Sequence, residues 1–136
     1  MSEYNIKKIK IGIVDLKSHN LFSILQACKN IGYKSSVIDP KERILKYDII
    51  IIPGVGSFKF AMKYLKLKNL ENKIKNFVTK KDKLLFGICL GMQLLFDESE
   101  EFGKTKGLGL LKGKVKRINY KNLKVPHIGW NYLIKK

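Results

Sequence analysis

The chain has 136 residues, 45% of them apolar and 29% charged, which predicts one globular domain over residues 1–136 and excludes two large lobes or a disordered chain. Its 28 basic and 11 acidic residues give a formal net charge of +17, which raises nucleic acid as a possible partner. Only Arg43 and Arg117 are arginines, the residue best suited to bidentate phosphate and base contacts, so we interpret the charge as a solvated lysine surface and expect no nucleic-acid partner.

Apolar segments and helical patterns alternate through the first two thirds of the chain. Strands are predicted at residues 9–14, 33–38, 48–52 and 84–88, and helical spacing is found at 21–31, 58–65 and 70–78. Ser18 is a candidate N-cap for the first helix. Continuous apolar runs suit strands buried on both faces, and parallel strands need helical crossovers. The order therefore predicts an α/β fold with a doubly wound, mostly parallel sheet.

The remaining third of the chain has a different pattern. Residues 89–96 have the composition of a helix, and an acidic cluster with Gly103 then predicts a loop; the cluster comprises Asp97, Glu98, Glu100 and Glu101. Residues 107–111, 113–118 and 124–133 are interpreted as short strands with no helices between them. We therefore expect a strand-rich C-terminal part.

The cysteines and the apolar runs bear on the compartment. Cys28 and Cys89 form neither a disulfide framework nor a zinc pattern, so a reducing compartment and no metal are expected. The first residues contain no apolar stretch of signal-peptide length, and the longest apolar run, 49–52 extended to 55, is too short to cross a bilayer. We expect a cytoplasmic protein without a membrane partner.

The most informative stretch is residues 87–91, Gly-Ile-Cys-Leu-Gly, at a predicted strand-to-helix junction. This is the pattern of a nucleophile elbow with cysteine in place of serine, where the glycines relieve crowding in a strained turn. A helix beginning after Cys89 would favour its thiolate, and the N–H of Leu90 could donate to an oxyanion. A buried structural cysteine is the alternative; it is the interpretation we adopt for Cys28, which lies on an apolar helical face.

A second glycine-containing loop, residues 53–57, follows another buried strand. In a parallel sheet both loops emerge at the carboxyl edge, where ligands bind. The backbone at Gly54 or Val55 could therefore supply a second oxyanion donor. The loop lacks the lysine and the spacing of a phosphate-binding P-loop, and by itself it could be only a turn.

Four motifs occur in one order: Pro53-Gly54-Val55-Gly56-Ser57-Phe58, Gly87-Ile88-Cys89-Leu90-Gly91-Met92-Gln93-Leu94-Leu95, Gly107-Leu108-Gly109-Leu110 and Lys124-Val125-Pro126-His127-Ile128-Gly129-Trp130-Asn131. Together they resemble class I glutamine amidotransferases, and specifically the glutaminase subunits of imidazole glycerol phosphate synthases. The elbow indicates the class, whereas the last motif makes the subfamily resemblance specific. The resemblance implies the flavodoxin-like fold of that class.

The resemblance also implies an activity and its partners. These glutaminases hydrolyse glutamine through a cysteinyl thioester, without a cofactor or a metal, and pass ammonia to a synthase subunit, a (β/α)8 barrel, in a heterodimer of histidine biosynthesis. Carried over by motif, Cys89 would be the nucleophile. Gly54, Val55 and Leu90 would form the oxyanion hole, and Gln93 and Gly56 would bind the substrate. The partner interface would contain His127, Gly129, Trp130 and Asn131.

One part of the family pattern is missing. The activating histidine of these enzymes lies in a His-Pro-Glu motif, which does not occur here, and the chain has only His19 and His127. His127 belongs to a different family motif, and we interpret His19 as a solvated loop residue. We therefore expect a C-terminally truncated member whose closing region is missing, with little activity alone. A glutaminase for surface-sugar amidotransferases and a non-catalytic remnant that only binds its partner are the alternatives.

Overall fold

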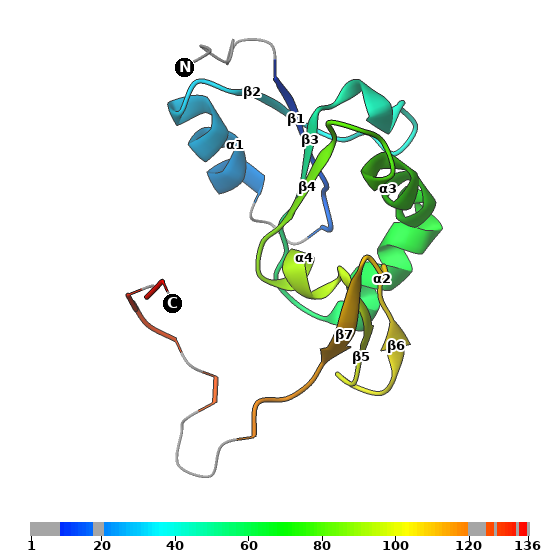
Figure 1. Cartoon of the computed structure of the whole chain (residues 1–136), viewed down its shortest axis with the longest axis vertical. Helices are drawn as coiled ribbons and strands as arrows, with labels where there is room; N and C mark the ends of the chain where they lie inside the picture. The colour runs from blue at the N-terminus through cyan, green and yellow to red at the C-terminus, as the bar shows by residue number, and fades with distance from the viewer. Residues whose placement is uncertain (1–8, 18–20, 120–124, 127, 133, 136) are drawn as a thin grey trace.

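The structure is a computed structural model that describes the chain except for residues 1–8, 18–20, 120–124, 127, 133 and 136 (Figure 1). Its main sheet has four parallel strands in the order β2-β1-β3-β4. Their bounds are Lys10–Ile13 for β1, Lys34–Val37 for β2, Ile49–Ile52 for β3 and Leu84–Gly87 for β4. All four predicted strands are therefore present, and the prediction of a parallel sheet is confirmed.

Helices pack on both faces of this sheet, which makes it doubly wound. Helix α1 (Leu21–Asn30) packs on one face, whereas α2 (Phe58–Leu67) and α3 (Leu70–Val78) pack on the other; a 3-10 turn, η2 (Ile44–Lys46), precedes β3. Figure 1 shows α1 beside β2 and β1, with α2 and α3 on the opposite side. The order of the strands reverses between β1 and β3, the position where ligands bind in such folds.

Alternate residues of the strands contribute to two separate apolar cores, one on each face of the sheet. The larger core joins Ile50 and Ile52 of β3 to Phe58, Ile74 and other buried side chains of α2 and α3. The smaller core lies beneath α1 and is formed by Ile11, Ile13, Cys28 and Ile51. Because β3 contributes to both cores, its four consecutive isoleucines have the double burial that the continuous apolar run predicted. Cys28 is 5% exposed, which agrees with its interpretation as a core residue.

The segment after the elbow folds differently from the prediction. Helix α4 covers only Leu90–Gln93, and a strand, β5 (Phe96–Ser99), begins where a helix was expected to end. The carbonyl oxygens of Leu94 and Leu95 accept hydrogen bonds from Leu108 and Leu110, each 2.8 Å long. These distant partners compete with further helical turns, so the prediction of a helix over 89–96 was wrong beyond residue 93.

Strand β5 is the centre of a small second sheet. It pairs antiparallel with β6 (Thr105–Lys106) and parallel with β7 (Leu111–Val115). The interpretation of the acidic cluster as a loop was therefore wrong for Asp97 and Glu98, which belong to β5. Residues 107–110 are not a strand, and β7 ends at Val115 rather than 118. A second sheet nevertheless confirms the strand-rich character of this part.

Three further expectations concern the first N-cap, the last strand and membrane spans. Ser18, the candidate N-cap, lies outside the described residues. In the predicted strand 124–133 the described residues are not in a strand, and residues 124, 127 and 133 are not described. None of the helices in the described part of the chain combines the length and apolarity needed to span a membrane.

Candidate functional site

The loop of residues 53–57, called the glycine loop below, and the elbow of residues 87–91 lie next to each other. The glycine loop follows β3, the elbow follows β4, and these two strands are paired in parallel with Ile52 opposite Gly87. Both segments therefore leave the sheet at its carboxyl edge, as the sequence predicted. Within the glycine loop, Gly54 is buried and Val55 is 55% exposed, so the loop runs from the core to the surface.

Cys89 adopts an unusual backbone conformation at the apex of the elbow. Its φ is 54° and its ψ is −115°, a region that a residue with a side chain occupies only under strain. Its side chain is exposed. Strain of this kind persists only where the surrounding structure imposes it, and here it presents a thiol at the edge of the sheet where ligands bind.

The two glycines of the elbow are required by close packing. A Cβ atom on Gly91 would lie 1.6 Å from the carbonyl oxygen of Ile52, and one on Gly87 would lie 2.6 Å from the Cα atom of Met92. Both obstacles are backbone atoms, which cannot move aside as a flexible side chain could. The Gly-x-Cys-x-Gly pattern therefore has the steric cause that the sequence suggested.

A backbone hydrogen bond joins the elbow to the glycine loop. The N–H of Leu90 donates to the carbonyl oxygen of Gly54 over 3.3 Å. Leu90 is thus placed beside Gly54, but the N–H expected to serve an oxyanion has a partner within the protein. Helix α4 has only four residues, so the dipole that was expected to favour the Cys89 thiolate is small.

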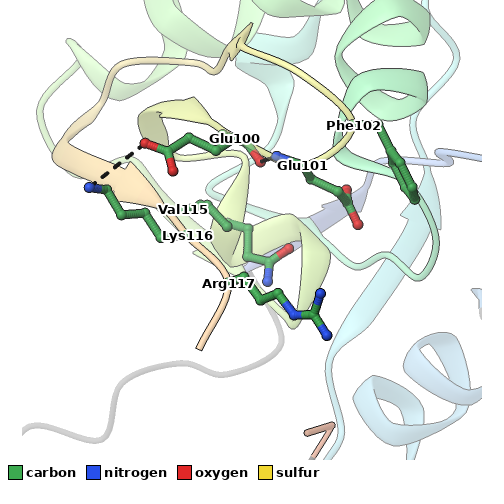
Figure 2. Close-up of a pocket in the computed structure, with 8 residues that line it drawn as sticks. Glu100, Glu101, Phe102, Val115, Lys116 and Arg117 are labelled. Atoms are coloured by element: carbon green, nitrogen blue, oxygen red, sulfur yellow. Dashed lines mark hydrogen bonds and ion pairs between the residues drawn. The ribbon is translucent and has the colours of Figure 1, made fainter. Parts of the chain in front are cut away.

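Gln93 lies one helical turn after Cys89 and lines a pocket of about 500 Å³. The lining residues are Gln93, Ser99, Glu100, Glu101, Phe102, Val115, Lys116 and Arg117. Figure 2 shows Glu100 directed toward Lys116 on one side, with Glu101 and Arg117 on the other side of the pocket. The pocket thus presents both signs of charge, whereas Cys89 and Gly56 are not part of its lining.

Glu101 connects this pocket to the glycine loop. Its Oε2 accepts a hydrogen bond of 2.9 Å from the backbone N–H of Phe58, the first residue of α2, while the Oγ of Ser57 accepts one from Phe60 over 3.4 Å. The buried Ser99 accepts a hydrogen bond from the N–H of Glu101 at 3.1 Å. The acidic cluster was the sequence signal for these pocket residues, but its interpretation as a loop concealed their position.

The small sheet that supports the pocket is held by charge pairs. The Glu98 carboxylate lies 2.7 Å from the Nζ of Lys114 and 2.9 Å from the Nζ of Lys104. Hydrogen bonds from Lys114 and then Lys104 lower the pKa of Glu98 from its ordinary value of 4.5 to about 2. Glu98 is therefore a structural anion that ties β5 to β7 and to the residues before β6.

The expected partner-interface residues are only partly described. Gly129, Trp130 and Asn131 are exposed, and Trp130 has its whole side chain open to solvent at 103%. His127 lies outside the described residues, as does His19. The structure thus places three of the four residues on the surface.

The fold and the elbow define a class of protein, and a comparison with known families identifies it. The sequence profile of the CobB/CobQ-like glutamine amidotransferase domain matches residues 10–127. The chain belongs to this family. A solved structure described as a glutamine amidotransferase has the same fold, with a TM-score of 0.67 at 24% identity over 79% of this chain and 56% of that one.

Among curated proteins, the chain is similar to subunits of one synthase. It is 48% identical over 128 residues to the imidazole glycerol phosphate synthase subunit HisH of Bacillus velezensis, and 46% identical over 128 residues to that of Bacillus subtilis strain 168. Each match covers 90% of this chain and 60% of the relative. The chain therefore spans about three fifths of the length of these relatives.

Proposed function

We propose that this chain carries the nucleophile and the oxyanion-binding backbone of a glutaminase. The observation that supports this most directly is the exposed thiol of Cys89 in a strained turn at the carboxyl edge of a parallel sheet. Because the strained turn leaves Cys89 exposed, a substrate carbonyl can approach its sulfur. Membership in a glutamine amidotransferase family supports glutamine as the substrate.

The proposed reaction has two stages. The Cys89 thiolate attacks the side-chain amide carbon of glutamine, and the tetrahedral intermediate expels ammonia after its nitrogen is protonated. The resulting thioester is hydrolysed by water, which releases glutamate and restores the thiol. The charge that develops on the amide oxygen in both stages requires hydrogen-bond donors directed at it.

Those donors would come from the two adjoining segments. The N–H of Leu90 is one, and the N–H of Val55 is the second candidate. In the structure the Gly54 carbonyl accepts from Leu90, so the peptide between Gly54 and Val55 presents its oxygen to that N–H. A rotation of this peptide would release the Leu90 N–H and turn the Val55 N–H toward the same place. We propose that substrate binding favours the rotated state.

The pocket beside Gln93 suits the zwitterionic end of an amino acid. Carboxylates such as that of Glu101 can accept hydrogen bonds from an ammonium group, and the guanidinium of Arg117 can donate to a carboxylate. Gln93 lies between this pocket and Cys89 along α4, and we propose that it binds the substrate together with Gly56 of the glycine loop. Glutamine would then extend from the charged pocket toward the thiol.

A complete reaction needs a general base, and the sequence lacks the His-Pro-Glu motif that holds this base in the enzymes the chain resembles. We propose that the 136-residue chain alone has little glutaminase activity, because loss of such a base lowers the rate by several orders of magnitude. The relatives are longer than this chain, which leaves room in them for the missing group.

For the destination of the ammonia, the names of the relatives favour one partner. Both are subunits of imidazole glycerol phosphate synthase, and neither supports the surface-sugar alternative. We propose a heterodimer with a (β/α)8-barrel synthase subunit in histidine biosynthesis. The exposed segment containing Gly129, Trp130 and Asn131, together with His127, is the proposed interface, because exposed aromatic side chains are enriched at such surfaces.

The decisive experiment measures the chemical reactivity of the Cys89 thiol separately from glutamine turnover. The native chain is treated with a glutamine-mimicking electrophile, and peptide mass spectrometry measures modification of both thiols. Cys89 should be modified much faster than Cys28, which is 5% exposed. Equal modification of both thiols in the folded chain would overturn the assigned site.

Turnover is tested in parallel by glutamate release in the presence of the synthase partner of the Bacillus subtilis relative. Release is expected to remain far below that of the complete relative. A rate close to that of the relative, and abolished by Cys89→Ala, would refute the proposal that this chain lacks its base while retaining the assignment of the nucleophile.

A further inference from the structure

Helix α2 has a broad apolar side that faces the core and a narrow apolar stripe that faces outward. The buried side is formed by Phe58, Ala61, Met62 and Leu65. On the outer side, Phe60 is 59% exposed and Leu67 is 76% exposed. Because seven residues make almost two helical turns, Phe60 and Leu67 lie on the same line along the helix. Packing of the core therefore explains the first set of apolar residues and leaves the outward pair without a role in the fold.

Four lysines flank this stripe, and all of them are exposed: Lys59, Lys63, Lys66 and Lys68. Two of them, Lys59 and Lys66, immediately precede the two apolar residues and so repeat with the same spacing along one side of the stripe. The helix contains no acidic residue, and within the described residues none of the four lysines forms an ion pair. The outer face of α2 thus combines exposed apolar groups with uncompensated positive charge.

A third exposed apolar side chain lies near the end of α2 where the helix begins. The Oε2 of Glu101 accepts its 2.9 Å hydrogen bond from the N–H of Phe58, which holds the turn of residues 101–103 against this end of the helix. Phe102, the next residue, is 80% exposed. Since Glu101 bonds to the backbone of α2, this contact leaves the lysines of the helix unpaired. Exposed apolar groups on adjoining segments are a feature of interaction surfaces.

We propose that the outer face of α2 binds an acidic amphipathic helix of another protein. Where two helices pair, apolar residues at a spacing of seven form the seam between them, and charged residues beside the seam form ion pairs across it. Phe60 and Leu67 supply the seam, and the half-buried Tyr64 widens it. The flanking lysines select a partner with leucine along its seam and glutamate on both sides. None of these side chains has a part in the proposed reaction.

The charge pattern favours this occupant over three others. A second copy of the chain would bring another net charge of +17, which repels the first. A nucleic acid or an anionic lipid surface would attract the lysines, but neither accounts for a lysine that precedes each apolar residue at a spacing of seven. A helix with the complementary spacing accounts for both the apolar and the charged residues.

The test uses three synthetic peptides of equal length. The acidic peptide has leucine at the first and fourth positions of each heptad and glutamate at the fifth and seventh, where like charges also oppose its pairing with itself. The basic peptide has lysine in place of those glutamates, and the scrambled peptide keeps the acidic composition without the heptad order. Isothermal titration calorimetry measures binding to the 136-residue chain. Only the acidic peptide is expected to bind, with an affinity that falls as salt is added.

Alanine variants locate the seam. Phe60→Ala and Leu67→Ala should each weaken binding of the acidic peptide about tenfold, because each removes an apolar group that the partner would cover. The control is Phe22→Ala on α1, which changes a side chain as exposed as Leu67, at 76%, on the other face of the main sheet. That variant should bind as the wild type does. Far-ultraviolet circular dichroism checks that each variant keeps its fold.

A charge exchange tests the flanking positions. The double variant Lys59→Glu with Lys66→Glu should lose the acidic peptide and gain the basic one, because the ion pairs beside the seam are then reversed. The control double variant, Lys29→Glu with Lys34→Glu, makes the same change in net charge at exposed positions on α1 and β2. It should still prefer the acidic peptide.

Four results would each overturn the proposal. Equal affinity for the acidic and scrambled peptides would mean general charge attraction, and equal binding by the Phe60 and Leu67 variants would exclude the seam. A dimer of the chain alone that Phe60→Ala disrupts would assign this face to a second copy. Tighter binding to phosphatidylglycerol vesicles than to the acidic peptide, lost in the same variant, would assign it to a lipid surface.

Discussion

The backbone N–H of Leu90 donates to the carbonyl oxygen of Gly54, and this 3.3 Å hydrogen bond joins the two segments of the candidate site. The donor belongs to the residue after Cys89, the proposed nucleophile, and the acceptor belongs to the glycine loop. The Leu90 N–H is therefore already bonded to a protein carbonyl, whereas a substrate oxyanion would need this N–H as a donor. Displacement of this bond is a measurable consequence of the proposed reaction.

An aldehyde analogue of glutamine should displace the bond when it forms a tetrahedral adduct with Cys89. The amide signals of Leu90 and Val55 are then expected to shift in nuclear magnetic resonance spectra, because both N–H groups would gain a charged acceptor. The reference signal is that of Gly103, which lies in an open loop where no atom comes within 4 Å of a Cβ built on it. An adduct that leaves the Leu90 signal unmoved would contradict its role as an oxyanion donor.

Gln93→Ala should slow modification of Cys89 by a glutamine-mimicking electrophile about tenfold at low reagent concentration, the effect of losing a polar contact to a bound ligand. Modification by iodoacetamide, which does not resemble glutamine, should stay the same. The matched control is Gln26→Ala, which changes the other glutamine, on α1. Equal slowing with both reagents would mean that Gln93 supports the thiol rather than the substrate.

Gly91→Ala should destabilise the fold by about 3 kcal/mol, because the new Cβ would meet the Ile52 carbonyl oxygen at 1.6 Å and force the elbow away from β3. Urea denaturation measures the loss. The control Gly32→Ala has φ of +86° but no atom within 4 Å of the new Cβ, so it should cost only about 1 kcal/mol. Similar losses for the two variants would show that packing at Gly91 is loose.

Glu98→Gln should remove an acid-dependent part of the stability. The pKa of Glu98 is lowered from 4.5 to about 2, so its charged form is favoured by folding. Its contribution is complete above pH 4.5 and is lost as the pH falls toward 2. The melting temperature of the wild type, measured by thermal unfolding, should therefore fall more steeply over this pH range than that of the variant.

Glu100→Gln is the control for this pH dependence, since its ion pair with Lys116 is longer, at 3.7 Å, and more exposed. That variant should keep the acid sensitivity of the wild type. If Glu98→Gln retained the same slope, the pairs with Lys104 and Lys114 would not persist in solution.

Local patterns were sufficient for the main sheet and for the elbow. The isoleucine run of β3 and the glycines at 87 and 91 each reflect a constraint that acts on one residue and its immediate surroundings, burial in the first case and backbone crowding in the second. Such residues can be interpreted from sequence because few other residue types satisfy these constraints. The family resemblance rested on the same short motifs, and the family match confirms it.

Contacts between distant segments decided the rest. Helix α4 ends at Gln93 because the carbonyls of Leu94 and Leu95 bond to residues 108–111, and Glu98 joins a strand because Lys104 and Lys114 neutralise it. The pairing of Leu90 with Gly54 and the 58% exposure of Phe86 on the edge strand β4 likewise depend on which strands are neighbours. The sequence by itself determined the kind of fold and the position of Cys89 in a glycine-flanked turn. The tertiary structure decided where the helix stops and what surrounds the thiol, because hydrogen bonds and burial between remote residues outweigh local preference.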